Sequence, residues 1–326
     1  MGQRHYLIVL LLMSVVSTAY GVNCSNAKFS PYPIQATPGY EHDKFGTWPQ
    51  DIVREYAAFI SSFDSADDDD WDGYEDRYAV PEWVAYEIKR FQTNPDGTYK
   101  KPQGASQRPS KWYKSHDLDF LFDDPSLISD RLDDSYRGIG DVYNRGHLAR
   151  KLHADRISWQ AGCNTHHLTN AVPQAAGFNQ GIWLDMENYT GAWANKYGRV
   201  WVITGPIFYR EAPRYVIGDA GEVPVDIPDA LFKIVIKEKP ATPLPDVLAF
   251  IYPQWNVQYY KTGKCQRDKT YSHTPFLVSV AQIEQATGLT FFTAMNWADE
   301  QQRTLKTQVA TSLWPVETKY FGDSCK

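Results

Sequence analysis

The chain has 326 residues, of which 43% are apolar and 22% are charged. These values are typical of a globular protein and exclude a disordered, collagen-like or coiled-coil chain. The net charge of −6 also excludes attraction to nucleic acid or anionic lipid through the overall field of the protein. Any site for a polyanion therefore has to be a local cluster of positive charge.

Residues 1–21 predict a signal peptide. Basic residues precede an apolar run from Tyr6 to Val16, and small residues follow up to Gly21. The run is shorter than the roughly 20 residues that a transmembrane helix needs, and no later stretch is long enough. We therefore expect a secreted or periplasmic protein that does not bind membranes, with a mature chain that begins near Val22.

The even number of cysteines predicts two disulfides in an exported chain. The four are Cys24, Cys163, Cys265 and Cys325, and the sequence leaves all three pairings open. Cys163 precedes His166 and His167 at a spacing that also suits zinc. Disulfide formation by Cys163 would compete with that role, and we favour the disulfide.

Taken in chain order, the predicted elements begin with an irregular arm over residues 22–50. Apolar residues at helical spacing, such as Ile52, Tyr56 and Ile60, predict a helix over 51–63. Apolar or alternating runs predict strands over 84–91, 199–209, 231–236 and 247–252. A capping-box pattern at Ser279 predicts a short helix that ends at Gly288. We expect an N-terminal arm over 22–80 that forms one globular unit with a main domain over 81–326.

Within the arm, an acidic loop matches the first half of a calcium-binding loop. Asp68, Asp70 and Asp72 alternate before Gly73, but Ala79 stands where such loops have their last carboxylate. The sequence leaves two interpretations open, a structural Ca²⁺ site and a solvated acidic turn.

Residues 178–197 predict the longest helix. Apolar residues recur at every third or fourth position from Phe178 to Tyr197, and Gly198 ends the pattern. Asn179 and Glu187 lie on a neighbouring face, about 12 Å apart along an ideal helix. An amide and a carboxylate on one face suit either a functional site or a solvated surface, and the helical pattern alone does not decide.

The segment Asn144-Arg145-Gly146-His147, in a region rich in turn-forming residues, carries residue types that suit phosphodiester hydrolysis. The reaction needs a base for the attacking water and positive charge beside the phosphate. His147 is a candidate base, and the planar guanidinium of Arg145 is suited to pair with phosphate oxygens. A hydrated divalent cation would supply the remaining charge.

Three motifs together resemble those of the DNA/RNA non-specific endonuclease family, whose members have a ββα-metal fold. They are Asn144-Arg145-Gly146-His147, then Asn170-Ala171-Val172-Pro173-Gln174, then Asn179-Gln180-Gly181-Ile182-Trp183 followed by Glu187. The similarity covers roughly residues 80–295. It implies an α+β fold with a central, mostly antiparallel sheet flanked by helices. It also implies a metal-dependent endonuclease that hydrolyses DNA and RNA with little sequence specificity.

The resemblance implies a role for each matched residue. His147 would be the general base, and Asn179 would be the one direct protein ligand of Mg²⁺ or Mn²⁺. Glu187 and Asn170 would hold waters around the ion or orient the base. Arg145 would contact the scissile phosphate. Further candidates for substrate binding are Arg108 and Arg150.

Two positions depart from the family pattern. Asn144 stands where many members have Asp, so a carboxylate that supports the local architecture is missing. Gly191 stands where some relatives have an Arg one helical turn beyond the Glu. Arg150 is our candidate to supply that contact.

The expected partners are DNA and RNA, and the sequence indicates no protein partner. We find no motif that reads base edges. Between Arg131 and Arg156 there are six Lys or Arg and four Asp, a local excess that fits contact with the phosphate backbone. Two other functions stay open: a phosphodiesterase or pyrophosphatase acting on nucleotides, and a catalytically silent protein that binds nucleic acid.

Overall fold

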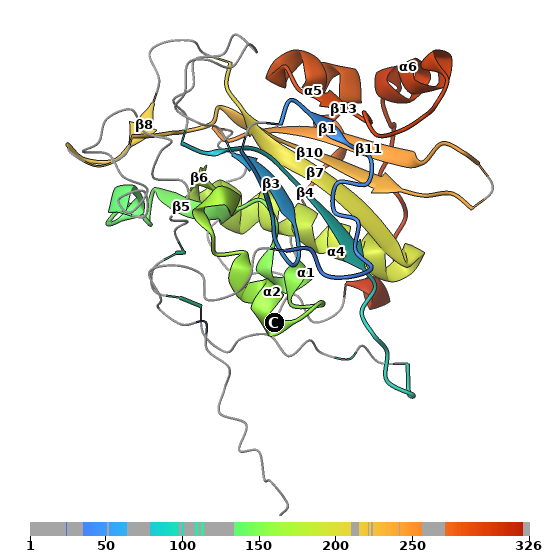
Figure 1. The fold of residues 1–326 in the computed structure, drawn as a ribbon, viewed down its shortest axis with the longest axis horizontal. Helices are drawn as coiled ribbons and strands as arrows, with labels where there is room; N and C mark the ends of the chain where they lie inside the picture. The colour runs from blue at the N-terminus through green and yellow to red at the C-terminus, as the bar shows by residue number, and fades with distance from the viewer. Residues whose placement is uncertain are drawn as a thin grey trace, which may run out of the picture.

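A seven-stranded sheet in which every pair of neighbours is antiparallel forms the centre of the molecule (Figure 1). This computed structural model describes residues 24, 35–50, 52–63, 79–97, 100, 108–109, 112–113, 134–209, 215–220, 222, 224–240, 242–255 and 271–321. In spatial order the strands are β12 (Leu277–Val278), β11 (Asp246–Pro253), β10 (Ala230–Lys237), β7 (Arg199–Ile207), β4 (Pro81–Lys89), β3 (Ile60–Phe63) and β2 (Ile52–Glu55). The mostly antiparallel sheet and the α+β class are as predicted.

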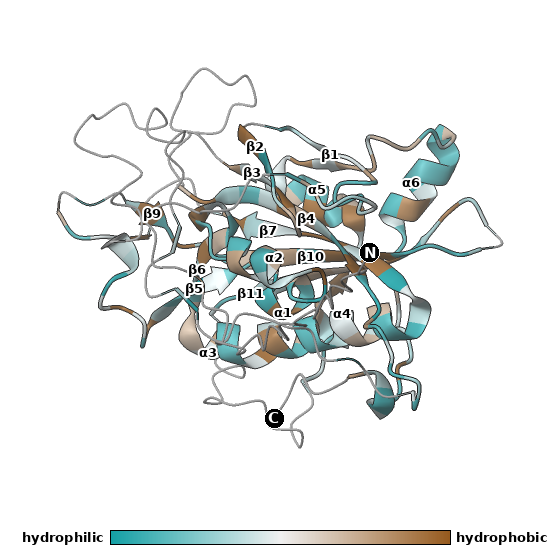
Figure 2. Ribbon diagram, turned by 60° about the horizontal axis from the view of Figure 1, so that its bottom comes forward, coloured by the Kyte–Doolittle hydropathy of each residue, from teal (hydrophilic) through white to brown (hydrophobic). Residues whose placement is uncertain are grey.

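Apolar side chains are buried on both faces of the sheet, which explains why its central strands have long apolar runs. One face packs against α4 (Leu184–Tyr197), and its core includes Val202, Val235 and Trp193. The opposite face includes Trp201 and Ile234 and is covered by α5 (Val280–Thr287) and α6 (Asp299–Thr307). Figure 2 shows these hydrophobic strands between more hydrophilic helices. The domain therefore has three layers, helix, sheet and helix.

The helix predicted over residues 51–63 is wrong. The segment is a hairpin of β2 and β3, closed by a hydrogen bond from the Tyr56 N–H to the carbonyl oxygen of Phe59 (2.7 Å). β3 pairs with β4, and Ser61 and Phe63 are buried there. The helical spacing of the apolar residues is coincidental. The segment forms strands because β3 pairs with β4, some twenty residues later, and strand formation depends on the surrounding sheet.

Most other predicted elements are confirmed. β4, β7, β10 and β11 overlap the four predicted strands. Helix α5 begins with a capping box formed by Ser279 and Gln282 and ends at Gly288, whose φ is 73°. Residues 35–63, which the sequence analysis placed in an arm, contribute β2, β3 and also β1 (Thr47–Trp48), which pairs with β13 (Thr290–Phe291).

The long predicted helix is present but not regular. It consists of α3 (Ala176–Phe178), a π-helical turn η5 (Asn179–Trp183) and α4, which ends before Gly198. Gly181 inside the turn has non-helical angles (φ −105°, ψ −111°). Because a π turn contains extra chain per turn, the ideal-helix spacing between Asn179 and Glu187 does not apply across it.

Cys24 is disulfide-bonded to Cys163 in α2 (Trp159–Asn164). Cys265, Cys325, the predicted signal peptide and the acidic loop with Asp68, Asp70 and Asp72 lie outside the described residues. In the part of the chain that the structure describes, no helix has the length and hydropathy of a membrane span.

Candidate active site

His147 lies at the end of a short strand, β5 (Tyr143–His147), beside the central sheet (Figure 1). β5 pairs antiparallel with β6 (Ala171–Ala175), so the segment expected to be rich in turns is a strand. Gly146 is required there, because a Cβ atom at this position would lie 2.2 Å from the side chain of buried Gln174. After β6 the chain continues directly into α3, η5 and α4. The paired strands β5 and β6 and the helix together form a ββα unit.

Buried Trp183 connects the helix to His147. Its indole N–H donates a hydrogen bond to the carbonyl oxygen of His147 (3.3 Å). The ammonium of Lys233 in β10 lies 4.1 Å from the centre of one Trp183 ring, a cation–π contact. The position of His147 therefore depends on the helix and on the sheet beneath it.

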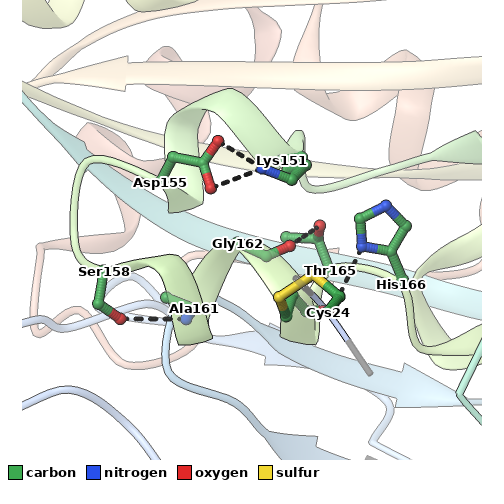
Figure 3. Close-up of a disulfide and its surroundings, with 9 residues drawn as sticks. Cys24, Lys151, Asp155, Ser158, Ala161, Gly162, Thr165 and His166 are labelled. Atoms are coloured by element: carbon green, nitrogen blue, oxygen red, sulfur yellow. Dashed lines mark hydrogen bonds and ion pairs between the residues drawn. A yellow bond between two sulfur atoms is a disulfide. The ribbon is translucent and has the colours of Figure 1, made fainter. Parts of the chain in front are cut away.

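Two aromatic rings surround the His147 imidazole. The ring of Trp112 lies 4.5 Å away and that of His166 lies 5.0 Å away, between ring centres. Figure 3 shows His166 beside the disulfide that holds α2; its Nδ1 lies 3.3 Å from the carbonyl oxygen of Cys163. The contact with His166 was not predicted, since its position beside His167 suggested zinc. Trp112 gave no signal in the sequence.

These surroundings keep His147 neutral. Burial lowers its pKa well below 6.5, and the charges of His166, Arg108, Lys151 and Arg150 act in the same direction. Its Nε2 atom is buried and has no hydrogen-bond partner among the described residues. A neutral imidazole with a free ring nitrogen is the form that accepts a proton.

The Asn179 amide is oriented by Asn144. The Asn144 Nδ2 donates to the carbonyl oxygen of Gly140 (2.7 Å), which turns the Asn144 Oδ1 toward the helix. That oxygen accepts hydrogen bonds from Asn179 Nδ2 (2.9 Å) and Gln180 Nε2 (3.1 Å). The Asn179 Oδ1 is thereby left without a hydrogen bond from the described residues, on a partly exposed side chain. An amide oxygen on a partly exposed side chain fits a hard, hydrated cation such as Mg²⁺ or Mn²⁺.

Glu187 lies in a buried group of charges on α4 and the sheet. Its Oε2 is 3.4 Å from the Nε of Arg150, whose Nη1 also donates to Asn188 Oδ1 (2.7 Å). Burial raises the pKa of Glu187, while the cations of Arg150 and Lys233 oppose that rise. Burial in turn lowers the pKa of Lys233 to about 8. Arg150 thus contacts Glu187 and Asn188 and not an open surface.

Asn170 holds the backbone that follows His147. Its Oδ1 accepts a hydrogen bond from the Ala149 N–H (2.7 Å), and its Nδ2 donates to the carbonyl oxygens of Ala149 and Thr165 (both 2.9 Å). All three bonds are to main-chain atoms two residues or more from His147. In this arrangement Asn170 contributes to the site by fixing the chain and not by direct contact with His147.

The other two predicted arginines lie on the His147 side of the unit. The guanidinium of Arg145 lies over the ring of Tyr136, 5.5 Å from its centre. Arg108 is exposed, and its charge lowers the pKa of His147 and of His166. Strand β5 thus carries His147 and Arg145, and the helix adds Asn179 and Glu187. No cluster of three or more His, Cys, Asp or Glu side chains that suits a metal occurs among the described residues.

Comparisons with known proteins agree with this arrangement. A sequence model described as "DNA/RNA non-specific endonuclease" matches residues 44–297. "Nuclease 1, mitochondrial" of Schizosaccharomyces pombe is 32% identical over 184 residues, which are 52% of this chain and 52% of that protein. "Endonuclease G, mitochondrial" of Homo sapiens is 31% identical over 161 residues, 48% of this chain and 50% of that one. The chain therefore spans about half the length of these curated relatives.

A solved structure shows the same fold. It is a chain from the crystal structure titled "EndoG/EndoGI complex: Mechanism of EndoG inhibition", with a TM-score of 0.54 and 22% sequence identity. The match covers 78% of this chain and 91% of that chain.

Proposed function

Because this chain belongs to the DNA/RNA non-specific endonuclease family, we propose that it hydrolyses phosphodiester bonds in DNA and RNA with a divalent cation and little sequence preference. The observation that carries the proposal is the presence, on one ββα unit, of a neutral imidazole and an oriented amide on a partly exposed side chain. His147 Nε2 is buried with no hydrogen-bond partner among the described residues and suits a base, and the Asn179 amide, held through its Nδ2, suits a cation ligand.

In this proposal His147 acts as the general base. Its Nε2 removes a proton from the attacking water as that oxygen bonds to phosphorus and the bond to the leaving oxygen breaks. The hydrogen bond from Trp183 to the His147 carbonyl oxygen and the rings of Trp112 and His166 keep the imidazole in place. General-base catalysis of this kind contributes typically about 10²–10⁴ to the rate.

The charged residues divide into two groups. Arg145 and Arg108 contact phosphate oxygens, for which a guanidinium has the matching geometry. Glu187, held by Arg150, supports the waters around a cation bound at Asn179, and Asn144 orients that ligand. When bound, Mg²⁺ or Mn²⁺ supplies positive charge to the phosphate and to the leaving oxygen.

We also propose that the protein is exported. The N-terminal apolar segment has the pattern of a signal peptide. The disulfide between Cys24 and Cys163 supports export, because such bonds persist mainly in oxidising compartments. Structural Ca²⁺ at Asp68, Asp70 and Asp72 stays a prediction.

The test is digestion of a supercoiled plasmid, of RNA and of a small phosphodiester by the purified protein, with Mg²⁺ and with EDTA. We expect nicking of the plasmid and degradation of RNA that EDTA stops, with much slower turnover of the small diester. Cleavage of the small diester alone would favour the nucleotide phosphodiesterase, and no cleavage with Mg²⁺ or Mn²⁺ would contradict the proposal.

A further inference from the structure

Exposed aromatic side chains lie at the border of the sheet where β7 and β11 end and β10 begins, beside the ββα unit. Seven large apolar side chains are exposed in the part of the chain that the structure describes. Five of them belong to segments that meet at this edge, as does partly buried Tyr143. Three of the five are aromatic: Tyr209 (59% exposed), Tyr215 (56%) and Trp255 (45%). We call Tyr143, Tyr209, Tyr215 and Trp255 the aromatic edge.

The strand register explains why these residues are neighbours. Ala230, the first residue of β10, pairs with Ile207 of β7 and with Pro253 of β11, so the ends of the three strands coincide. Tyr209 and Trp255 each lie two residues beyond such an end. Tyr215 is joined to the same edge by the hydrogen bond from the Ile227 N–H to its carbonyl oxygen (2.7 Å). In Figures 1 and 2 the β8–β9 pair (Val216–Ile217 and Val225–Asp226) lies at the same end of the molecule as β5 and β6.

Trp255 is held rigidly against the unit that carries the base. Its neighbour Gln254 is fully buried and bonds to the Ala175 N–H (2.8 Å) and to the carbonyl oxygens of Pro173 (3.1 Å) and Pro228 (2.6 Å). Two of these three partners belong to β6. The Trp255 ring packs edge-to-face on Tyr143 in β5, with ring centres 5.9 Å apart. The indole is thus exposed to solvent on an anchored backbone.

Tyr143 connects the aromatic edge to the phosphate-binding residues. It precedes Arg145 by two residues and His147 by four in the same strand. At about 3.4 Å per residue, these separations are about 7 Å and about 14 Å along β5. The aromatic edge therefore lies within a few nucleotides of the phosphate that would be cleaved.

Among the described residues, two carboxylates lie at this edge. The Asp229 carboxylate accepts a hydrogen bond from the Tyr209 N–H (2.9 Å), and Glu222 accepts one from the Asp219 N–H near Tyr215 (2.8 Å). These carboxylates would repel a phosphate backbone laid across them, but not an uncharged nucleobase. Exposed aromatic rings stack on every base, and this stacking tolerates any sequence.

We propose that the aromatic edge, with Trp255 as its main contact, stacks unpaired nucleobases and so makes single-stranded segments preferred substrates. This proposal rests on the proposed function, because it assumes that nucleic acid binds along β5. Bases in a duplex are already stacked on each other and present no free face, so duplex DNA gains nothing from these rings.

The experiment measures dissociation constants in an inactive His147→Ala background, with and without Trp255→Ala. The probes are an oligothymidylate, an abasic strand of the same length, and a duplex closed by hairpins at both ends. We expect Trp255→Ala to weaken oligothymidylate binding about tenfold, as loss of one base–aromatic stack does, and to change the other two constants less than about twofold. Trp255→Phe should keep most of the affinity, because a phenyl ring also stacks.

Trp48→Ala is the matched control, because Trp48 is 47% exposed but lies in β1, which pairs with β13 away from β5. An unchanged oligothymidylate constant in Trp255→Ala would overturn the proposal. So would an equal loss on the abasic strand, or a change in oligomeric state, which would assign the surface to contacts between copies. Plasmid cleavage by the wild-type protein tests the proposed function separately. If the wild-type protein cleaves plasmid but one of these results is obtained, only the role of the aromatic edge is refuted.

Discussion

The amide of Asn144 joins the turn before β5 to the first residues of the helix. It donates to the Gly140 carbonyl oxygen and accepts from Asn179 and Gln180. An Asp at this position would accept the same two bonds but could not donate to Gly140. The departure from the family pattern therefore keeps the orientation of Asn179 and adds a bond to the turn. The sequence shows only that the carboxylate is missing. The hydrogen bonds of Asn144 show that the amide takes over its role.

We predict that Asn144→Ala weakens binding of the divalent cation. Without the acceptor, the Asn179 amide is free to rotate, and loss of such a supporting partner typically costs about 10–100-fold in metal affinity. Titration with Mn²⁺ measures binding, and the Mg²⁺ concentration for half-maximal cleavage should rise in parallel. Asn144→Asp should stay within a few-fold of wild type. Identical Mn²⁺ titrations of wild type and Asn144→Ala would show that the ion does not bind at Asn179.

His42 predicts a pH dependence of stability. It is buried, its Nδ1 accepts a hydrogen bond from the Glu87 N–H, and burial lowers its pKa to about 4. As the pH falls, His42 is therefore protonated near pH 6.5 in the unfolded chain but only near pH 4 in the folded chain. Stability from this group is complete above pH 6.5 and falls as the pH drops, by about 3 kcal/mol at pH 4.

His42→Gln isolates this effect, because glutamine keeps a donor and an acceptor but does not titrate. Urea unfolding from pH 8 to pH 4 should show a smaller loss of free energy in the variant than in wild type. Parallel curves for the two proteins would mean that His42 titrates normally.

At the scale of elements, prediction succeeded where the pattern was local. The capping box at Ser279 and the stop at Gly288 need only neighbouring residues, and both are present in α5. The hairpin of β2 and β3 was missed because its partner strand β4 is distant in sequence. The π turn was missed because the spacing of three or four residues between apolar positions is the same in a regular α-helix and does not reveal an added residue. The rings of Trp112 and His166 reach His147 through tertiary contacts that no local pattern encodes.

Gly146→Ala tests the close approach of β5 and β6. The new Cβ atom would lie 2.2–2.4 Å from three atoms of the buried Gln174 side chain. Overpacking of this kind costs typically about 1–3 kcal/mol. We expect a lower free energy of unfolding and a large loss of cleavage, since His147 is the next residue.

The control is Gly140→Ala, where a Cβ atom meets nothing within 4 Å. It should leave both properties near wild type. If Gly146→Ala unfolds at the same urea concentration as Gly140→Ala, β5 and β6 are less tightly packed at Gln174 than the structure indicates.

At the scale of the whole molecule, the disulfide links Cys24 to α2 over 139 residues of sequence. Restricting so long a loop lowers the entropy of the unfolded chain, and loss of a native disulfide typically costs about 2–5 kcal/mol. Cys163→Ser should therefore unfold at a clearly lower urea concentration than oxidised wild type. Equal midpoints for oxidised wild type and Cys163→Ser would mean that the bond does not constrain the fold.

The fold class was predictable because three motifs identify the ββα unit, and the apolar strands indicate a sheet buried on both faces. The pairing of the cysteines and the place of residues 35–63 in the sheet were not predictable, because each depends on contacts between segments far apart in the chain. The −6 net charge likewise did not indicate a polyanion substrate, since the arginines that would meet phosphate form a local group around β5.

The central claim is that His147 is the base of a phosphodiester hydrolysis. Its most direct measurement is the initial rate of plasmid cleavage at saturating Mg²⁺ by wild type and by His147→Ala, with circular dichroism to verify that both are folded. Removal of the base should lower the rate by about 10²–10⁴ while binding of DNA is retained. A folded His147→Ala protein that cleaves at nearly the wild-type rate would contradict the account.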